Sequence, residues 1–292
     1  MRALRLASAA ATVAVLLGTA TACGGDAKSS DAKAGDTRTA EAKGGEIKAP
    51  EAKAADPLAA ALAGDPKAAL AASAVVMQKA GNGKVAMIPS DPENPGGTGD
   101  ADWKDPAKAS TDLLGDMGGK KLKIRVVGVD AYLGGDEAAA ALGGKHWVKL
   151  SSDETGATFR AAGQMLNPVL LLTVGAQSGK LSKVGQEAVD GVQTVHLRAE
   201  QDTAVLVAGM TGLPEAQRPA VQKSLEEDGK TLTIDFWLND KQELVQYQEY
   251  GEKNGTKGAV TVKYSNLGKG APIAAPAAGD LGSEADLLKL LG

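Results

Sequence analysis

The sequence predicts an α+β fold in which a curved antiparallel sheet, or half-barrel, carries helices on its concave face. Three observations predict it. Apolar and polar residues alternate with the period of a strand, as in 122–126 and 232–238. The pair Asp190-Gly191 joins two further such segments as a tight hairpin turn. Segments with helical spacing interrupt the strands, and helices must cover the apolar face of such a sheet.

The N-terminus has the order of a secretory signal peptide, which we expect to occupy 1–22. Arg2 and Arg5 precede an apolar run over 6–17, and small residues fill 18–22. This run is shorter than the roughly 20 residues that a membrane-spanning helix needs. The alternative is a buried N-terminal helix of the folded domain.

Cys23 follows this segment and is the single cysteine of the chain. The stretch Ala20-Thr21-Ala22-Cys23 resembles a bacterial lipobox, and the resemblance implies a thioether-linked diacylglycerol on Cys23. Two or three acyl chains anchor a protein stably, whereas one is marginal. We therefore expect a lipoprotein anchored on the outer, extracytoplasmic face of the cell membrane. The alternative is a secreted protein that is cleaved near Ala22.

Residues 23–56 are predicted to form a disordered tether that begins at lipidated Cys23. From Asp26 to Asp56 an acidic residue recurs at every fifth position, and a basic residue follows two positions after each except the last. This period fits neither a helix nor a strand. Ile47 is the single large apolar residue within 24–56, so this segment cannot bury enough apolar surface to become ordered. A flexible coil of this length spans about 30–35 Å.

Residues 57–292 are predicted to form one domain. Its first helix begins at Asp65-Pro66, an N-cap and N1 pair, and ends before Gly81. The further expected elements are strands through residue 150, helical segments at 157–176 and 203–227 on either side of a hairpin at 180–197, strands at 232–238, 244–250 and 260–264, and an amphipathic turn at 287–291.

The segment 157–176, which Asn167-Pro168 divides, holds more large apolar residues than one helical face needs. Two interpretations stay open for it. It is either a fully buried helix or a flap over an apolar cavity.

Composition and motifs argue against several function classes. A net charge of −4 does not attract nucleic acid. A single cysteine rules out a disulfide or a cysteine cluster within the chain, and two histidines are too few for a typical zinc site. The stretch 175–180 imitates a phosphate-binding loop but lacks its first glycine. His196 is interpreted as structural, and no nucleophile is paired with a base, so we expect no enzyme, no metal and no cofactor.

Several short motifs, in a shared order, resemble the LppX/LprG-type lipoproteins of actinobacteria. The most extensive is the hairpin pattern G-x-E-x-V-D-G-V-x-T-x-H over 185–196. The other matching segments are the strand IDFWLND at 234–240, the closing segment at 270–276, and the pair 132–133 with 146–148. The resemblance covers about residues 65–290 and implies the LolA/LolB half-barrel fold.

The resemblance also implies a binding protein that holds or carries a lipid or glycolipid by its acyl chains, without catalysis. The residues themselves show surplus apolar surface at 157–176 and 203–210. We expect an apolar cavity between the sheet and the helices, lined by Ile124, Val126, Met165, Leu170, Leu206, Ile234 and Phe236. The alternative is an extracytoplasmic regulator or sensor that acts by protein–protein contact, as RseB/MucB-like proteins of this fold do. In both cases we expect a monomer that meets the membrane through its anchor on Cys23.

Overall fold

The computed structural model describes residues 58, 63–92, 94, 96–117, 119–151 and 154–291. The predicted signal peptide at 1–22, Cys23 and the predicted tether at 23–56 lie outside the described residues. Within the described ranges, none of the helices has the length and apolar character needed to cross a bilayer.

The described strands form one open antiparallel sheet with β6 and β7 at its edges. The first half of the sheet runs in sequence order from the centre to one edge. Its strands are β1 (Asn82–Pro89), β2 (Gly97–Asp102), β3 (Ser110–Met117), β4 (Lys120–Val127), β5 (Asp130–Gly134) and β6 (Trp147–Lys149).

The second half of the sheet starts at the opposite edge and returns to the centre. Its strands are β7 (Lys180–Val189), β8 (Val192–Asp202), β9 (Thr231–Leu238), β10 (Leu244–Gly251) and β11 (Val260–Ser265). Strand β11 pairs with β1, with Val262 opposite Met87. The β7–β8 turn has positive φ at both Asp190 and Gly191, the backbone that an Asp-Gly hairpin favours. The first and last strands of the domain therefore meet in the middle of the sheet.

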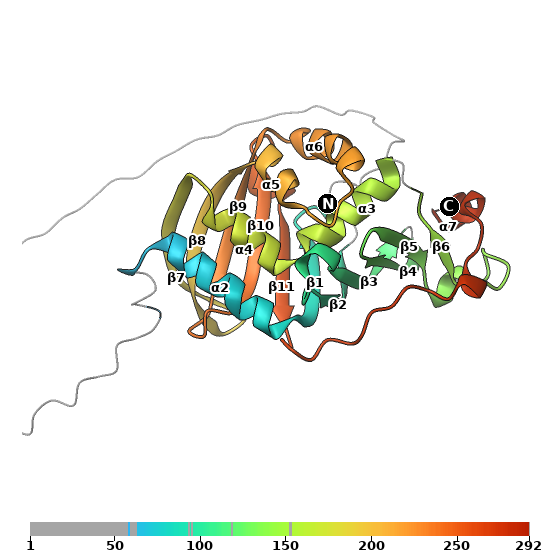
Figure 1. Ribbon diagram of the computed structural model, residues 1–292, viewed down its shortest axis with the longest axis horizontal. Coiled ribbons are helices and arrows are strands. Elements are labelled where there is room, and N and C mark those ends of the chain that lie inside the picture. Colours follow the sequence, from blue (N-terminus) through green and yellow to red (C-terminus); the bar gives the residue numbers. More distant parts are fainter. Residues whose placement is uncertain are drawn as a thin grey trace, which may run out of the picture. The chain divides into compact units, whose positions relative to one another are not determined.

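Five helices lie along one side of this sheet (Figure 1). They are α2 (Pro66–Ala80), α3 (Glu154–Met165), α4 (Pro168–Ala176), α5 (Thr203–Gly209) and α6 (Arg218–Glu226). As predicted, α2 begins after Asp65, whose carboxylate accepts a hydrogen bond from the Lys67 amide, and ends at Gly81 with φ 76°. The short elements are the 3₁₀ turns Pro106–Lys108, Asp136–Ala138, Glu215–Gln217, Gly255–Gly258, Ala278–Asp280 and Glu284–Asp286, and helix α7 (Leu287–Leu291).

The predicted fold class is confirmed: a single antiparallel sheet carries helices on one side. The sequence pattern is weakest in β2 and β3, because glycines replace the alternating apolar residues there. Gly99 is required by packing, since a Cβ at this position would collide with the carbonyl group of Asp112 in β3. The segment between β5 and β6 places Ala138 and Leu142 in the core.

Two apolar clusters fill the space under the helices. The larger one joins α2, α4 and α5 to strands from both halves of the sheet, and it includes the fully buried Leu70, Phe236 and Tyr247. The smaller one lies at the β4–β5 end, where Phe159 of α3 packs with Leu133. The core therefore has a main part and a satellite at one end of the sheet.

After β11 the chain continues toward the β6 edge as a segment, 266–286, that contains two 3₁₀ turns and pairs with no strand along most of its length (Figure 1). The Gly270 amide donates a 2.7 Å hydrogen bond to Asn82 Oδ1, and the Ala271 amide donates a 2.9 Å hydrogen bond to Asp100 Oδ1. Asp100 lies on the face of the sheet away from the helices, because its neighbour Ala101 belongs to the core. The segment thus straps the outer face of the sheet.

Candidate functional site

Helix α4 packs on the sheet, with α2 on one flank and α5 on the other. Eight of its nine residues are buried, and Thr173 is the exposed one. The helix starts where the sequence predicts a break. Asn167 caps it through Oδ1, which accepts hydrogen bonds from the amides of Val169 (3.0 Å) and Leu170 (3.3 Å), while Pro168 occupies the first turn. Of the two interpretations left open, the structure shows the fully buried helix for α4.

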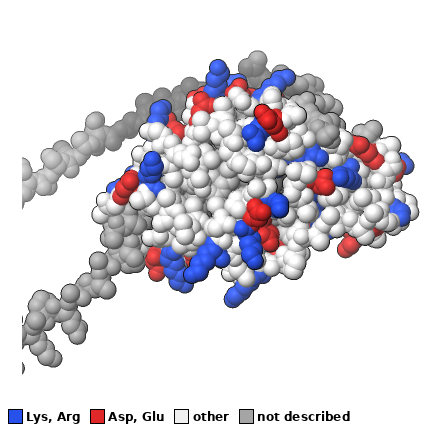
Figure 2. Space-filling view, in the orientation of Figure 1, with Lys and Arg blue, Asp and Glu red and all other residues white. Residues whose placement is uncertain are grey.

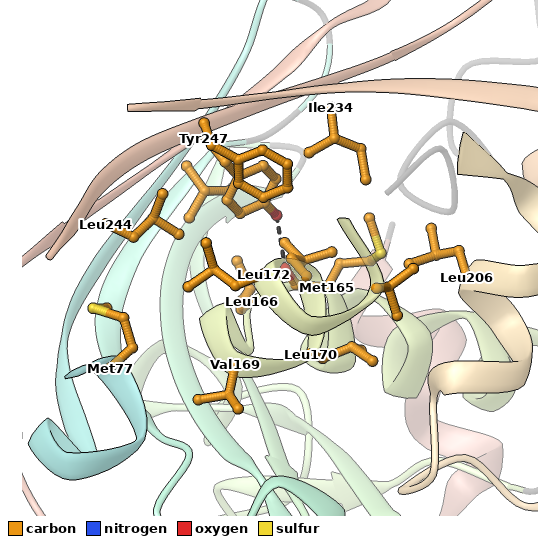
Figure 3. Close-up of a cluster of buried hydrophobic side chains, with 14 of the residues drawn as sticks. Met77, Met165, Leu166, Val169, Leu170, Leu172, Leu206, Ile234, Leu244 and Tyr247 are labelled. Carbon is orange, nitrogen blue, oxygen red and sulfur yellow. Dashed lines mark hydrogen bonds between the residues drawn. The ribbon is translucent and has the colours of Figure 1, made fainter. Parts of the chain in front are cut away.

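Two tyrosines of the sheet hold the junction between α3 and α4. The hydroxyl of Tyr247 donates a 2.8 Å hydrogen bond to the carbonyl of Met165, drawn in Figure 3, and the hydroxyl of Tyr264 donates a 3.1 Å hydrogen bond to the carbonyl of Leu166. Burial raises the pKa of both phenols well above the usual value. These bonds satisfy carbonyls that the end of α3 leaves without helical partners.

The seven residues predicted to line a cavity are all buried, at 8% exposure or less. Five of them gather in the larger cluster around α4; Figure 3 labels four of these. The members in the larger cluster are Met165, Leu170, Leu206, Ile234 and Phe236, and those in the smaller cluster are Ile124 and Val126. The structure therefore brings the first five together and places the other two elsewhere.

The inner side of α4 lies directly on the sheet. A Cβ added at Gly175 would come within 2.9 Å of the Phe236 ring. Such a contact is closer than side-chain packing allows, so glycine lets the helix approach the strand. The open space at α4 is on its outer side, where Leu170 reaches the wall of a pocket.

The α2–α4 groove is the first hollow on this outer side, with a volume of 480 Å³. Its walls are mainly small and apolar, and Lys67 is its single charged lining residue. The residues that form most of it are Ala71, Ala74 and Val75 of α2 and Val169, Thr173 and Ala176 of α4. This volume falls in the roughly 300–1,000 Å³ range of small-molecule sites.

The α4–α5 pocket is the second hollow, with a volume of 270 Å³. It lies on the other flank of α4, between Leu170 and Val174 of α4 and Gly209 of α5. Both hollows are lined by Val169, Thr173 and Gln177, so they lie on either side of the exposed edge of α4.

The surface around these hollows is poor in charge. Figure 2 shows the same side of the molecule, with a largely white area left of its centre and Lys, Arg, Asp and Glu around that area. Two large apolar side chains are exposed there, Val75 of α2 at 68% and Val205 of α5 at 45%. The helical side thus offers an apolar surface to a ligand or partner.

Sequence reasoning predicted none of the polar residues that line these hollows, and the most deeply buried of them is Gln164 in the last turn of α3. It lines the α4–α5 pocket and is 1% exposed, and neither its amide nitrogen nor its amide oxygen has a hydrogen-bond partner among the described residues. A polar residue between Phe159 and Met165, in a segment expected to be buried, was the signal available in the sequence.

His196 lies on the opposite face of the sheet, in a polar cluster. Its ring nitrogens are 2.8 Å from Glu187 Oε1 and 2.9 Å from Asp235 Oδ1, and its ring stacks on Trp237 with centroids 4.3 Å apart. Burial alone would raise the pKa of Asp235, but hydrogen bonds with His196 and Arg198 hold it below its usual value. Both ring nitrogens face carboxylates, which supports the structural interpretation of this histidine.

Among the described residues, no group of three or more His, Cys, Asp or Glu side chains is arranged to hold a metal ion. The residues that line the grooves offer apolar contacts, neutral hydrogen-bonding groups and the ammonium group of Lys67.

The open antiparallel sheet with helices on one side agrees with the α+β fold class predicted from the sequence. No known family profile matches the chain. Two solved structures that it resembles are LprF from Mycobacterium bovis (16% identity, TM-score 0.47, covering 73% of this chain and 98% of that one) and LppX from Mycobacterium tuberculosis (14%, TM-score 0.46, 72% and 100%). The complex of MucA and MucB from Pseudomonas aeruginosa is more distant (14%, TM-score 0.33, 76% and 62%). At these identities the likeness concerns the fold alone.

A curated relative is an uncharacterized 31.2 kDa protein in the rplA–rplJ intergenic region of Streptomyces griseus. It is 32% identical over 163 residues. The match spans about half of each of the two chains, 53% in both cases.

Proposed function

We propose that this protein is a lipid-anchored extracytoplasmic binding protein that holds an acyl chain of a lipid or glycolipid, without catalysis. The observation that supports it most is the largely apolar α2–α4 groove, which shares three lining residues with a second pocket on the other flank of α4. The site of the proposal differs from the one expected from sequence. The chain of the ligand lies on the outer side of α4, because the inner side packs directly on the sheet at Phe236.

Apolar burial is sufficient to hold such a ligand. Burying ten CH₂ groups contributes about 8 kcal/mol before the entropy of association is subtracted. The groove walls supply alanine, valine and threonine side chains, which accept a flexible chain without a specific polar contact.

Anchoring at Cys23 completes the proposal. The sequence between Cys23 and Asp56 would act as a flexible tether with a span of about 30–35 Å. Such a tether keeps the domain close to the lipid surface from which an acyl chain is taken.

Filling the groove tests the proposal. The mature chain carrying Cys23→Ser is titrated with a dodecanoyl methyl ester that bears a fluorophore. We expect saturable binding, and Ala71→Trp, which fills the groove, weakens it at least tenfold. Ala68→Trp is the matched control, because Ala68 is exposed on the same helix and does not line the groove. If the Cys23→Ser protein, without either tryptophan substitution, shows no saturable binding of the ester, the proposal is ruled out.

The alternative is a regulator that binds another protein through the same helical side. The exposed Val75 and Val205 favour it, because large apolar side chains at a weakly charged surface are typical of protein contacts. The two functions differ in the effect of gene deletion. A regulator alters envelope-stress transcription with unchanged envelope lipids, whereas a lipid carrier alters the lipids.

A further inference from the structure

The residues that line the α4–α5 pocket include one buried side-chain amide with unsatisfied hydrogen-bonding atoms, that of Gln164. Gln164 is 1% exposed, and its Nε2 and Oε1 lack hydrogen-bond partners among the described residues. A buried amide without partners destabilises a fold, and native proteins retain such groups rarely. An unsatisfied amide in a pocket wall therefore indicates a ligand that completes it.

The position of the amide is defined by its neighbours. A Cβ at Gly212 would come within 2.6 Å of Gln164 Nε2, so the amide lies against the 211–212 turn, and Thr211 of this turn also lines the pocket. Two other side-chain amides line the pocket, and one of them, Gln177, is exposed just after α4. Asn167 caps α4 through Oδ1 and donates a 3.3 Å hydrogen bond through Nδ2 to the carbonyl of Pro106.

The pocket is also neutral. The residues that line the pocket include no Lys, Arg, His, Asp or Glu. The one charged residue that lines either hollow is Lys67, in the α2–α4 groove. An anionic head group in the pocket would lose its hydration and meet the Gln164 carbonyl oxygen without a compensating cation. A hydroxyl group can donate to Oε1 and accept from Nε2, so it satisfies both ends of the amide.

We propose that Gln164 recognises an uncharged, hydroxyl-bearing head group, and that the acyl chain of the same molecule lies across α4 in the α2–α4 groove. This inference rests on the proposed function. It specifies the class of ligand: a neutral amphiphile, such as an acylated polyol, in preference to a free fatty acid.

Two competitors with the same acyl chain but different head groups test this inference. The fluorescent dodecanoyl methyl ester is displaced from the Cys23→Ser chain by 1-monolauroylglycerol or by laurate at pH 8. We expect the glycerol ester to compete at least tenfold better. Gln164→Met reduces the ratio of the two competitor affinities to less than twofold, and this ratio is compared within the variant. The control Gln193→Met, at an exposed position of β8 away from the grooves, keeps the preference.

A measurement without a substitution gives an independent readout. The side-chain NH₂ resonances of Gln164 shift when 1-monolauroylglycerol saturates the protein, and laurate leaves them in place. Equal competition by the two amphiphiles, or a preference for laurate that Lys67→Met abolishes, overturns the inference and leaves the proposed function standing. Failure of the probe and both amphiphiles to bind overturns both.

Discussion

Tyr247 donates a 2.8 Å hydrogen bond from the sheet to the main-chain carbonyl of Met165, at the end of α3 (Figure 3). Tyr264 does the same for Leu166, one residue further along. The two phenols lie with ring centroids 6.3 Å apart. The α3–α4 junction is therefore pinned to β10 and β11, and with it the position of α4 between the two hollows.

Replacing Tyr247 by Phe tests how much this hydrogen bond contributes to the stability of the fold. The Met165 carbonyl is left without its donor in a buried site, so we expect Tyr247→Phe to lower the free energy of unfolding by about 1–3 kcal/mol. Urea denaturation measures the change. Tyr132→Phe is the control, because the hydroxyl of Tyr132 lies 3.5 Å from Asp130 Oδ2, at the limit of a hydrogen bond. Equal stabilities of the two variants would contradict the assigned role of Tyr247.

The same tyrosines predict a loss of stability at high pH. In the unfolded chain they ionise near pH 10, whereas burial keeps them protonated in the fold at that pH because it raises their pKa. Above pH 10 the folded state thus binds more protons than the unfolded state, and the free energy of unfolding decreases as pH rises. Each phenol contributes a slope of up to about 1.4 kcal/mol per pH unit.

Urea denaturation at pH 8 and pH 11 measures this slope. Lysines titrate in the same range, so the comparison is with the double variant Tyr247→Phe, Tyr264→Phe, which should have a clearly shallower slope. Identical slopes would show that the two phenols do not carry the alkaline sensitivity.

The sequence was informative where the signal is local. Asp65-Pro66 and Gly81 bound α2, Asn167-Pro168 starts α4, and Asp190-Gly191 makes the hairpin, because each pair acts through the backbone of its immediate neighbours. These signals were enough to predict the α+β class and most of the element order.

The site could not be predicted in the same way. Ile124 and Phe236 both alternate correctly along their strands, but β4 and β9 lie in different halves of the sheet, with β3, β2, β1, β11 and β10 between them. The two side chains therefore belong to different apolar clusters. The close approach of α4 to the sheet at Gly175 also depends on contacts between distant segments, so no local pattern encodes it.

Cys23 lies outside the described residues, and its lipidation stays a prediction from the sequence. We expect Cys23→Ser to move the protein from the washed membrane pellet to the soluble and culture fractions, because the thioether cannot form on a hydroxyl. Cell fractionation and mass spectrometry of the N-terminal peptide measure the outcome. Ser29→Ala, in the same segment, should remain in the pellet with an acylated peptide. A Cys23→Ser protein that resists alkaline washing of the membrane would show a different mode of attachment.

We expect that replacing the buried amide of Gln164 by an apolar side chain stabilises the ligand-free protein. Its buried amide lacks partners, and such a group costs about 1–3 kcal/mol relative to an apolar side chain of similar shape. We expect Gln164→Met to raise the melting temperature without ligand by roughly 3 °C, since about 1 kcal/mol corresponds to 2–4 °C in a domain of this size. Differential scanning fluorimetry measures the shift, with Gln193→Met as the unchanged control. A melting temperature that falls in Gln164→Met would mean that the amide is satisfied within the fold, and the pocket would then be a packing feature.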